Sequence, residues 1–467
     1  MRTSIRTALA TAVTVSLTGG LLGLTAGTAT AAAPAKAAKT VQPYDFNGDG
    51  IRDYTIDVYD RVIVTYGTAT GPGTETFTFD QNSPGIPGER ADEMERFGFD
   101  QASADFNGDG YADLAVSDPN ESVGEHAERG MVVIVWGSES GLGSKASTID
   151  PTSPQTDQGF GQSLVTGDFS GDGKPDLAVA DDRAVHVHRG GFSSETGATG
   201  KVSTFTPPKG SGLRPERLAA GNVTKDKATD LYVLGFRFTD DYRYVTGTWF
   251  LKGGSTIKPG KPKMAAKATR DSARHGVVAD FDKDGYGDLA YDDYTYKGDA
   301  GSVVVLRGGK NGPTTSYRLT QDTPGVATAA TEEDSFGTSL SVGDTNRDGY
   351  PDLAIGTNET LGPDLGDRDI RGHGGAHVLH GGKKGLTGAG SKWFTRDTPG
   401  IPGKARPSAG FGSQVRLHDF DRDGDADLLL SEAGPGNMTR EPLLSGGRSG
   451  ITTKNLREVP LKATFPQ

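Results

Sequence analysis

The stretch DFNGDGYAD, residues 105–113, carries four oxygen-bearing side chains at positions 1, 3, 5 and 9, namely Asp105, Asn107, Asp109 and Asp113. Alternate side chains at positions 1, 3 and 5 can converge on one point, and position 7 can add its backbone carbonyl. Gly110 at position 6 permits the sharp turn, with a positive φ, that such a loop needs. The spacing predicts a Ca²⁺ loop, because Mg²⁺ prefers fewer protein ligands and several waters.

This nine-residue pattern recurs along the chain. Six copies are intact and a seventh is damaged, and their first residues are 54 to 75 residues apart. An isolated cluster of this composition is often a solvated turn, but six regular copies favour metal binding. The predicted calcium ligands, including each position-7 carbonyl, are Asp45, Asn47, Asp49, Ile51, Asp53, Asp105, Asn107, Asp109, Tyr111, Asp113, Asp168, Ser170, Asp172, Lys174, Asp176, Asp280, Asp282, Asp284, Tyr286, Asp288, Asp344, Asn346, Asp348, Tyr350, Asp352, Asp419, Asp421, Asp423, Asp425 and Asp427.

The fourth copy departs from the pattern. It keeps Asn222, Asp226 and Asp230, but Lys227 replaces the glycine and brings a cation into the loop. We therefore expect this loop to be empty and about six Ca²⁺ to bind elsewhere. The formal charge of the chain is −12, and much of the acid lies in the loops. Folding and calcium binding are expected to be coupled, because clustered carboxylates repel one another without metal.

Short apolar runs follow the loops, and most later loops are preceded by a Phe-Gly pair, as at Phe97, Phe160, Phe336 and Phe411. Each repeat reads as four short strands with no sustained helical period. One such unit cannot bury its own faces, whereas seven arranged radially can. We therefore predict an all-β, seven-bladed β-propeller over residues 41–467. Its blades are four-stranded and antiparallel, with a calcium loop between the first and second strands. A linear β-array is the alternative.

The Phe-Gly segments and Asp-rich loops together resemble the FG-GAP repeat family, which includes the integrin α-subunit propeller and VCBS-like bacterial proteins. The phrases at 82–88, 322–326 and 397–403, which share a Pro-Gly turn, resemble its secreted bacterial branch. The resemblance covers essentially all of 41–467 and implies a calcium-binding propeller. It says little about activity, because one fold hosts many functions.

The N-terminus predicts export. Residues 8–30 are uncharged and follow Arg2 and Arg6, and Ala29 and Ala31 are the small residues that signal peptidase accepts at −3 and −1 of a cut after Ala31. We expect a Sec signal peptide over 1–31, a disordered segment over 32–40, and a secreted, extracellular chain with no membrane span after cleavage. A retained membrane anchor is the alternative.

The cysteine count, the charge and the catalytic motifs that the sequence lacks bear on the possible functional classes. There is no cysteine, so thiol catalysis and Cys-type zinc sites are excluded. We expect no nucleic-acid partner, because the chain is acidic and shows no basic patch with interleaved aromatics. No G-x-S-x-G, H-E-x-x-H or P-loop pattern occurs, so we predict no enzyme and no catalytic residue.

These observations favour a monomeric interaction, adhesion or scaffold module with an extracellular protein or glycan ligand. A lectin is the first alternative, although the three tryptophans share no repeat position. A secreted hydrolase or lyase is the second. Within the resembled family, ligands approach the face opposite the calcium loops. We expect the partner surface there, with the 357–375 connection as its longest loop.

Overall fold

The computed structural model describes residues 41–58, 60–89, 95–269, 275–358, 372–432, 440–461 and 465. The predicted signal peptide, 1–31, and the 32–40 segment lie outside these residues. Every regular element among the described residues is a β-strand, so the all-β prediction is confirmed. None of the described segments forms a helix that could cross a membrane.

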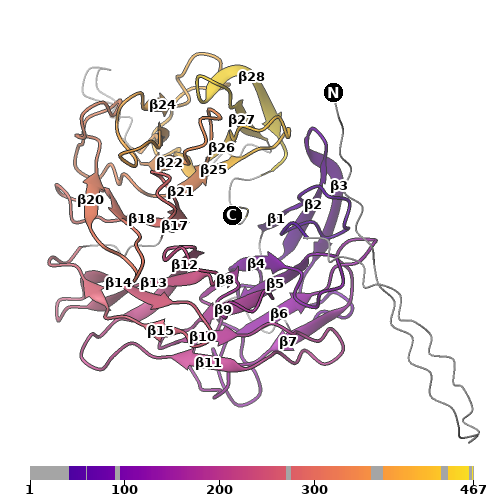
Figure 1. The fold of residues 1–467 in the computed structure, drawn as a ribbon. Coiled ribbons are helices and arrows are strands. Elements are labelled where there is room, and N and C mark those ends of the chain that lie inside the picture. Colours follow the sequence, from indigo (N-terminus) through magenta and orange to yellow (C-terminus); the bar gives the residue numbers. More distant parts are fainter. Residues whose placement is uncertain are drawn as a thin grey trace, which may run out of the picture. The chain divides into compact units, whose positions relative to one another are not determined.

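Seven antiparallel sheets follow one another along the chain, and we call them blades 1 to 7 (Figure 1). Their strands are β1 (Tyr54–Asp57), β2 (Val62–Thr68) and β3 (Gly71–Phe79) in blade 1; β4 (Gln101–Ala104), β5 (Asp113–Asp118), β6 (Met131–Val135) and β7 (Ala146–Ile149) in blade 2; β8 (Ser163–Gly167), β9 (Asp176–Ala180), β10 (Val185–His188) and β11 (Val202–Phe205) in blade 3; β12 (Arg214–Gly221), β13 (Asp230–Phe238), β14 (Tyr244–Lys252), β15 (Lys258–Pro259) and β16 (Lys263–Met264) in blade 4; β17 (Gly276–Ala279), β18 (Asp288–Asp292), β19 (Val303–Leu306) and β20 (Ser316–Leu319) in blade 5; β21 (Leu340–Gly343), β22 (Asp352–Thr357), β23 (Gly375–Leu379) and β24 (Lys392–Phe394) in blade 6; and β25 (Phe411–His418), β26 (Asp427–Glu432), β27 (Glu441–Ser445) and β28 (Thr452–Val459) in blade 7.

The predicted seven-bladed propeller is confirmed, with two local differences. Blade 1 pairs three strands among the described residues, because the segment before its loop forms no ladder. Blade 4 adds a short fifth strand, β16, which pairs with β14 beside β15. In blades 2 to 7 the Asp-rich loop joins the first and second strands, and in blade 1 it leads directly into β1.

The core is divided among the interfaces between blades. Seven clusters of buried apolar side chains occur, and each combines residues of two neighbouring blades. The phenylalanines of the Phe-Gly pairs, such as Phe160 and Phe336, are fully buried in them. Loop position 2 contributes a second anchor, as with Phe46 and Phe281. A two-faced sheet is thus stabilised by burying each face against the next sheet.

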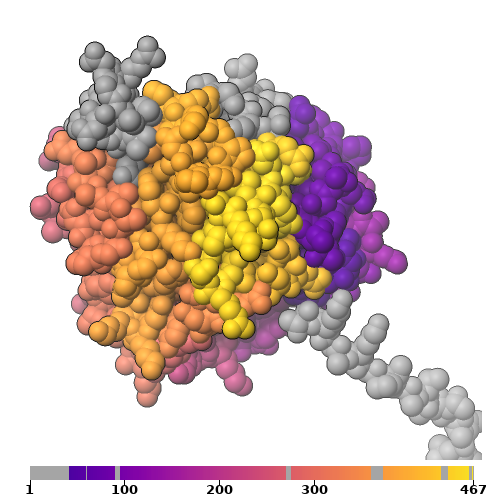
Figure 2. Space-filling model, turned by 90° about the horizontal axis from the view of Figure 1, so that it is seen from above, coloured from indigo at the N-terminus to yellow at the C-terminus, as the bar shows by residue number. Residues whose placement is uncertain are grey.

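Side chains join the last blade to the first. The ring of Tyr54 in β1 stacks on Phe420 with centroids 5.6 Å apart, and Phe465 packs edge-on to Tyr54 at 5.4 Å. Arg457 in β28 donates to the carbonyl of Thr70 at 2.6 Å. Figure 2 shows blade 7, in yellow, directly beside blade 1, in indigo. Within the described residues no strand of one terminus enters the sheet of the other, so this seam depends on side-chain packing.

Candidate metal sites

The six intact loops share one backbone conformation. Their position-6 glycines all have positive φ, between 80° and 100°, as the turn requires. Each position-1 aspartate accepts a hydrogen bond from the position-6 N–H, at 2.8 to 3.1 Å. Each position-5 aspartate accepts one from the position-7 N–H, at 2.7 to 3.2 Å. The loops therefore hold their position-1 and position-5 carboxylates in a repeated geometry.

In two loops the first three carboxylates converge. Oxygen atoms of Asp280, Asp282 and Asp284 lie within 4.8 Å of one another, and so do those of Asp419, Asp421 and Asp423. The position-9 carboxylates of these loops each keep a buried oxygen, Oδ2 of Asp288 and of Asp427, that accepts no hydrogen bond from any described residue. An all-carboxylate donor set of this kind fits a hard cation such as Ca²⁺.

The position-9 aspartates also brace the blades, because their hydrogen bonds link each loop to the next strand. In all seven loops, the damaged one included, one oxygen of this carboxylate accepts a hydrogen bond of 2.7 to 3.0 Å from a glycine N–H. The glycine lies near the end of the next strand of the same blade or shortly after it. In Asp53, Asp113, Asp176, Asp230 and Asp352 the other oxygen accepts a backbone N–H from position 2 or 3 of the same loop. This structural role was not anticipated from the sequence.

Burial alters the acidity of these groups. It raises the pKa of Asp113 to about 8, and the neighbouring carboxylates of Asp109 and Asp105 raise it as well. It likewise raises the pKa of Asp53 to about 7, that of Asp427 to about 7 and that of Asp288 to about 6. A dication beside such a carboxylate would stabilise its charged form.

The fourth loop has a different arrangement. Lys227 at position 6 does not have the positive φ of the glycines. Lys252 forms an ion pair with Asp226 at 3.1 Å, and the Thr224 hydroxyl donates to Asp230 at 2.8 Å. One oxygen of Asp226 and one of Asp230, which a cation would need as ligands, are thus already bound by other side chains. The residues present here do not fit a calcium ion.

Neighbouring loops contact one another around the ring. In loops 2, 4, 5 and 7 the position-8 N–H donates to the position-1 carbonyl of the preceding loop, as from Ala112 to Asp45 at 3.0 Å and from Ala426 to Asp344 at 2.8 Å. Position 4 adds a cation in the later blades. Lys225 donates to the carbonyl of Asp284 at 2.9 Å.

Lys283 in loop 5 makes the corresponding contact with the carbonyl of Asp348 at 3.4 Å. Arg347 in loop 6 pairs with Asp423 at 2.9 Å and with Asp425 at 2.7 Å. The environment of each of these loops therefore includes a side chain from the preceding blade. The earlier blades have glycine at position 4 (Gly48, Gly108 and Gly171).

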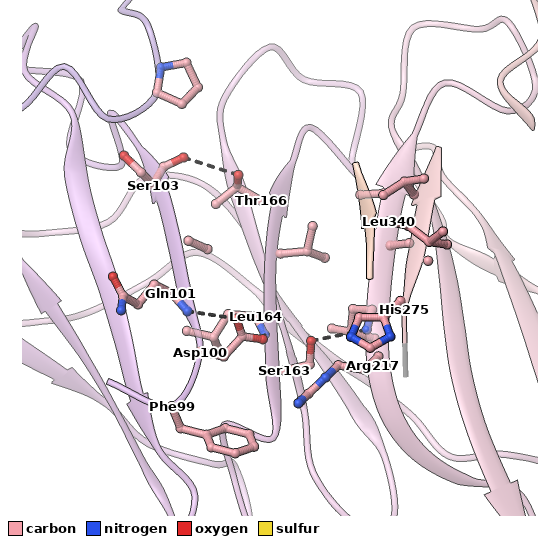
Figure 3. Close-up of a pocket in the computed structure, with 18 of the residues that line it drawn as sticks. Phe99, Asp100, Gln101, Ser103, Ser163, Leu164, Thr166, Arg217, His275 and Leu340 are labelled. Carbon is pink, nitrogen blue, oxygen red and sulfur yellow. Dashed lines mark hydrogen bonds between the residues drawn. The ribbon is translucent and has the colours of Figure 1, made fainter. Parts of the chain in front are cut away.

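The central channel holds a cavity of about 550 Å³ that is lined by the innermost strands. Figure 3 shows Asp100, Ser163, Arg217 and His275 along its wall. Burial raises the pKa of Asp100, while the Arg217 charge opposes that shift. The Arg217 guanidinium lies 5.1 Å from the centre of the Phe99 ring. The cavity is polar and mixed in charge, and sequence patterns did not predict it because its residues come from all seven blades.

The face opposite the loops carries the predicted partner surface. Most of its longest connection, 357–375, lies outside the described residues. Elsewhere on this face, buried polar pairs hold the connections together. Arg396 and Arg406 both bind the Glu432 carboxylate, at 2.8 and 2.6 Å, and Gln81 donates to Glu121 at 2.5 Å. The connections that are described are therefore fixed by hydrogen-bonded side chains.

Two family models match the chain. The model of the FG-GAP-like repeat matches residues 105–179, and that of the FG-GAP repeat matches 160–203 and 336–363. Phosphatidylinositol-glycan-specific phospholipase D of Rattus norvegicus is 32% identical over 120 residues, which are 26% of this chain and 14% of that protein. Integrin alpha-PS2 of Drosophila melanogaster is 28% identical over 233 residues, 45% of this chain and 16% of the integrin. The alignments thus span less than one fifth of either relative.

Among solved structures, an Agrocybe aegerita lectin described as recognising non-reducing terminal N-acetylglucosamine superposes with a TM-score of 0.49 at 14% identity. The superposition covers 88% of this chain and 90% of the lectin. The repeat models match blades 2, 3 and 6, and the integrin α-subunit aligns over nearly half of the chain. Together with seven blades joined through buried Phe-Gly segments, these matches identify the chain as an FG-GAP-like repeat propeller.

Proposed function

We propose that this propeller is an extracellular interaction module whose loop face is stabilised by about six Ca²⁺ and whose opposite face binds a protein or glycan. The ions would be held by the side chains at positions 1, 3, 5 and 9 and the carbonyl at position 7 of the six intact loops. Ca²⁺ would supply charge neutralisation there. The residues themselves set the loop conformation and brace the adjoining strand.

The observation that carries the proposal is the convergence of carboxylates in loops that also bridge neighbouring blades. Three carboxylates lie within 4.8 Å of one another at Asp280, Asp282 and Asp284, and again at Asp419, Asp421 and Asp423. Arg307 pairs with Asp282 and Arg347 with Asp423, but one arginine does not balance three carboxylates. The remaining negative charges repel one another at the interfaces that hold the ring together. Calcium is therefore expected to stabilise the whole propeller and to keep the opposite face rigid enough for recognition.

Elemental analysis and thermal melting of the purified exported chain test this proposal. We expect about six bound Ca²⁺ and a large loss of stability in chelator. Asp284→Ala in an intact loop should remove one ion, whereas Asp226→Ala in the fourth loop should remove none. A metal-free protein that melts at the same temperature with and without chelator would refute the proposal.

Secretion belongs to the same proposal and rests on the predicted signal peptide over 1–31. Detecting the chain in culture medium, with its N-terminus near residue 32, would test it. A catalytic role is not part of the proposal.

A further inference from the structure

Blade 4 differs in charge from the rest of the chain. Between residues 214 and 270 there are 12 lysines and arginines against 5 aspartates and glutamates, in a protein whose formal charge is −12. The blade that carries the damaged calcium loop is therefore strongly basic. Much of this charge lies on its outer edge, where β15 and β16 pair with β14.

The edge lysines are exposed and uncompensated. Lys258, Lys261, Lys263 and Lys267 are all exposed to solvent. None of the four forms an ion pair with another described residue, whereas Lys145 on blade 2 pairs with Glu195 at 3.0 Å. Like charges concentrated on one edge repel one another and attract an anionic ligand.

An aromatic cluster adjoins this edge. The rings of Phe236, Phe238 and Tyr244 lie 5.0 to 5.1 Å apart in pairs. They belong to the extended hairpin of β13 and β14, nine residues each, which projects on the face opposite the calcium loops. Phe238 is 42% exposed. The Arg214 guanidinium lies 6.0 Å from the Phe236 ring and adds a further cation.

The hairpin tip presents another ring. Tyr242 is 83% exposed and has a φ of 57°, a conformation that a bulky residue rarely adopts. The tip is nevertheless fixed, because Thr239 and Arg243 are joined by a backbone hydrogen bond of 2.9 Å. An exposed aromatic held in a disfavoured conformation contributes little to folding, which points to a role in binding.

Strand register connects the lysines to the aromatic cluster. Lys263 pairs with Thr248 in β14, and Thr269 pairs with Tyr244 at the start of the same strand. Lys267 lies between these two pairings, so lysines and rings follow one edge. We propose that this edge of blade 4 binds an anionic polysaccharide. Sugar rings would stack on Phe238 and Tyr242, and the carboxylate or sulfate groups would pair with the lysines.

The ring geometry favours sugars over nucleic-acid bases. The three clustered rings are inclined to one another by 47° to 73° and are in contact. They leave no slot between parallel rings for a base, but they expose single faces and edges against which sugar C–H groups pack.

The proposal rests on the proposed interaction role but not on calcium. Binding should be measured by calorimetry in low salt with three probes: polygalacturonate, heparin and single-stranded oligo-dT. We expect the wild type to bind at least one polysaccharide more tightly than oligo-dT, with affinity falling as salt rises. The double variant Lys263→Ala/Lys267→Ala should bind about tenfold more weakly, since two exposed charge pairs are lost.

A second variant, Phe238→Ala/Tyr242→Ala, should also weaken binding and lower the melting temperature only slightly, because Phe238 is partly exposed and Tyr242 is largely so. The matched control is Lys383→Ala/Lys384→Ala, which removes two exposed lysines from blade 6 and should bind normally. Equal binding by all variants, no polysaccharide binding by wild type, or preference for oligo-dT would overturn the proposal. Polysaccharide binding by a protein that carries no calcium would instead refute the ion-stabilised module and leave this site standing.

Discussion

Asp230 provides a direct test of the brace formed by position-9 aspartates, because its loop does not fit a calcium ion. Its buried carboxylate accepts three hydrogen bonds of 2.8 Å, from the Gly253 N–H, the Thr224 N–H and the Thr224 hydroxyl. Replacing it with alanine leaves two buried backbone N–H groups unsatisfied. At roughly 1 to 3 kcal/mol for each unsatisfied group, Asp230→Ala should destabilise the propeller by about 2 to 6 kcal/mol.

Urea unfolding followed by tryptophan fluorescence would measure this loss, and hydrogen exchange at Gly253 would localise it. Asp226→Ala is the control, because Asp226 is exposed and its ion pair with Lys252 should contribute less than about 1 kcal/mol. In chelator, Asp113→Ala in the intact second loop should cost as much as Asp230→Ala. In calcium it should cost more, since an ion is lost as well. If Asp230→Ala were as stable as Asp226→Ala, the reasoning about the brace would be wrong.

Three further predictions follow from the loops and the seam. Arg347→Ala should raise the calcium affinity of the seventh loop several-fold in a calcium titration, because the guanidinium pairs with the predicted ligand Asp423; an unchanged or lower affinity would contradict this. In chelator, stability should fall as pH rises from about 4 to about 8. The native state keeps protons on buried carboxyls, such as Asp113 with its pKa of about 8, that the unfolded chain has already lost. With saturating calcium this fall should disappear, and urea midpoints across the pH range would show either behaviour. Phe465→Ala should cost about 3 to 5 kcal/mol in urea unfolding, since the ring is fully buried between two blades, and a cost below about 1 kcal/mol would show that the seam does not depend on it.

The propeller could be predicted from the sequence because its signals are local and repeated. The loop from Asp105 to Asp113 fixes a turn, the apolar run after it fixes a strand, and Phe160 marks the segment that enters the next interface. The three-stranded first blade could not be predicted, since strand pairing before Asp45 depends on partners distant in sequence. Calcium occupancy itself remains a prediction.

The dual role of the position-9 aspartates was missed for a different reason. Asp230 persists in a loop that has lost its glycine, which was the available signal for a structural function. The expectation that no basic patch with interleaved aromatics offsets the acidic charge does not hold for blade 4. The net charge of the whole chain does not show that one blade is basic, and the proximity of Phe238 to Tyr244 follows only from strand register.

The way in which the last blade meets the first has a mechanical consequence. Many closed rings interlock their ends by sharing a sheet, whereas here Tyr54, Phe420 and Phe465 form an aromatic clasp. In the part of the chain that the structure describes, this contact can open without breaking any strand ladder, so the molecule should yield under tension first between β1 and β25. Pulling the propeller by its ends should then peel it blade by blade, starting from this junction.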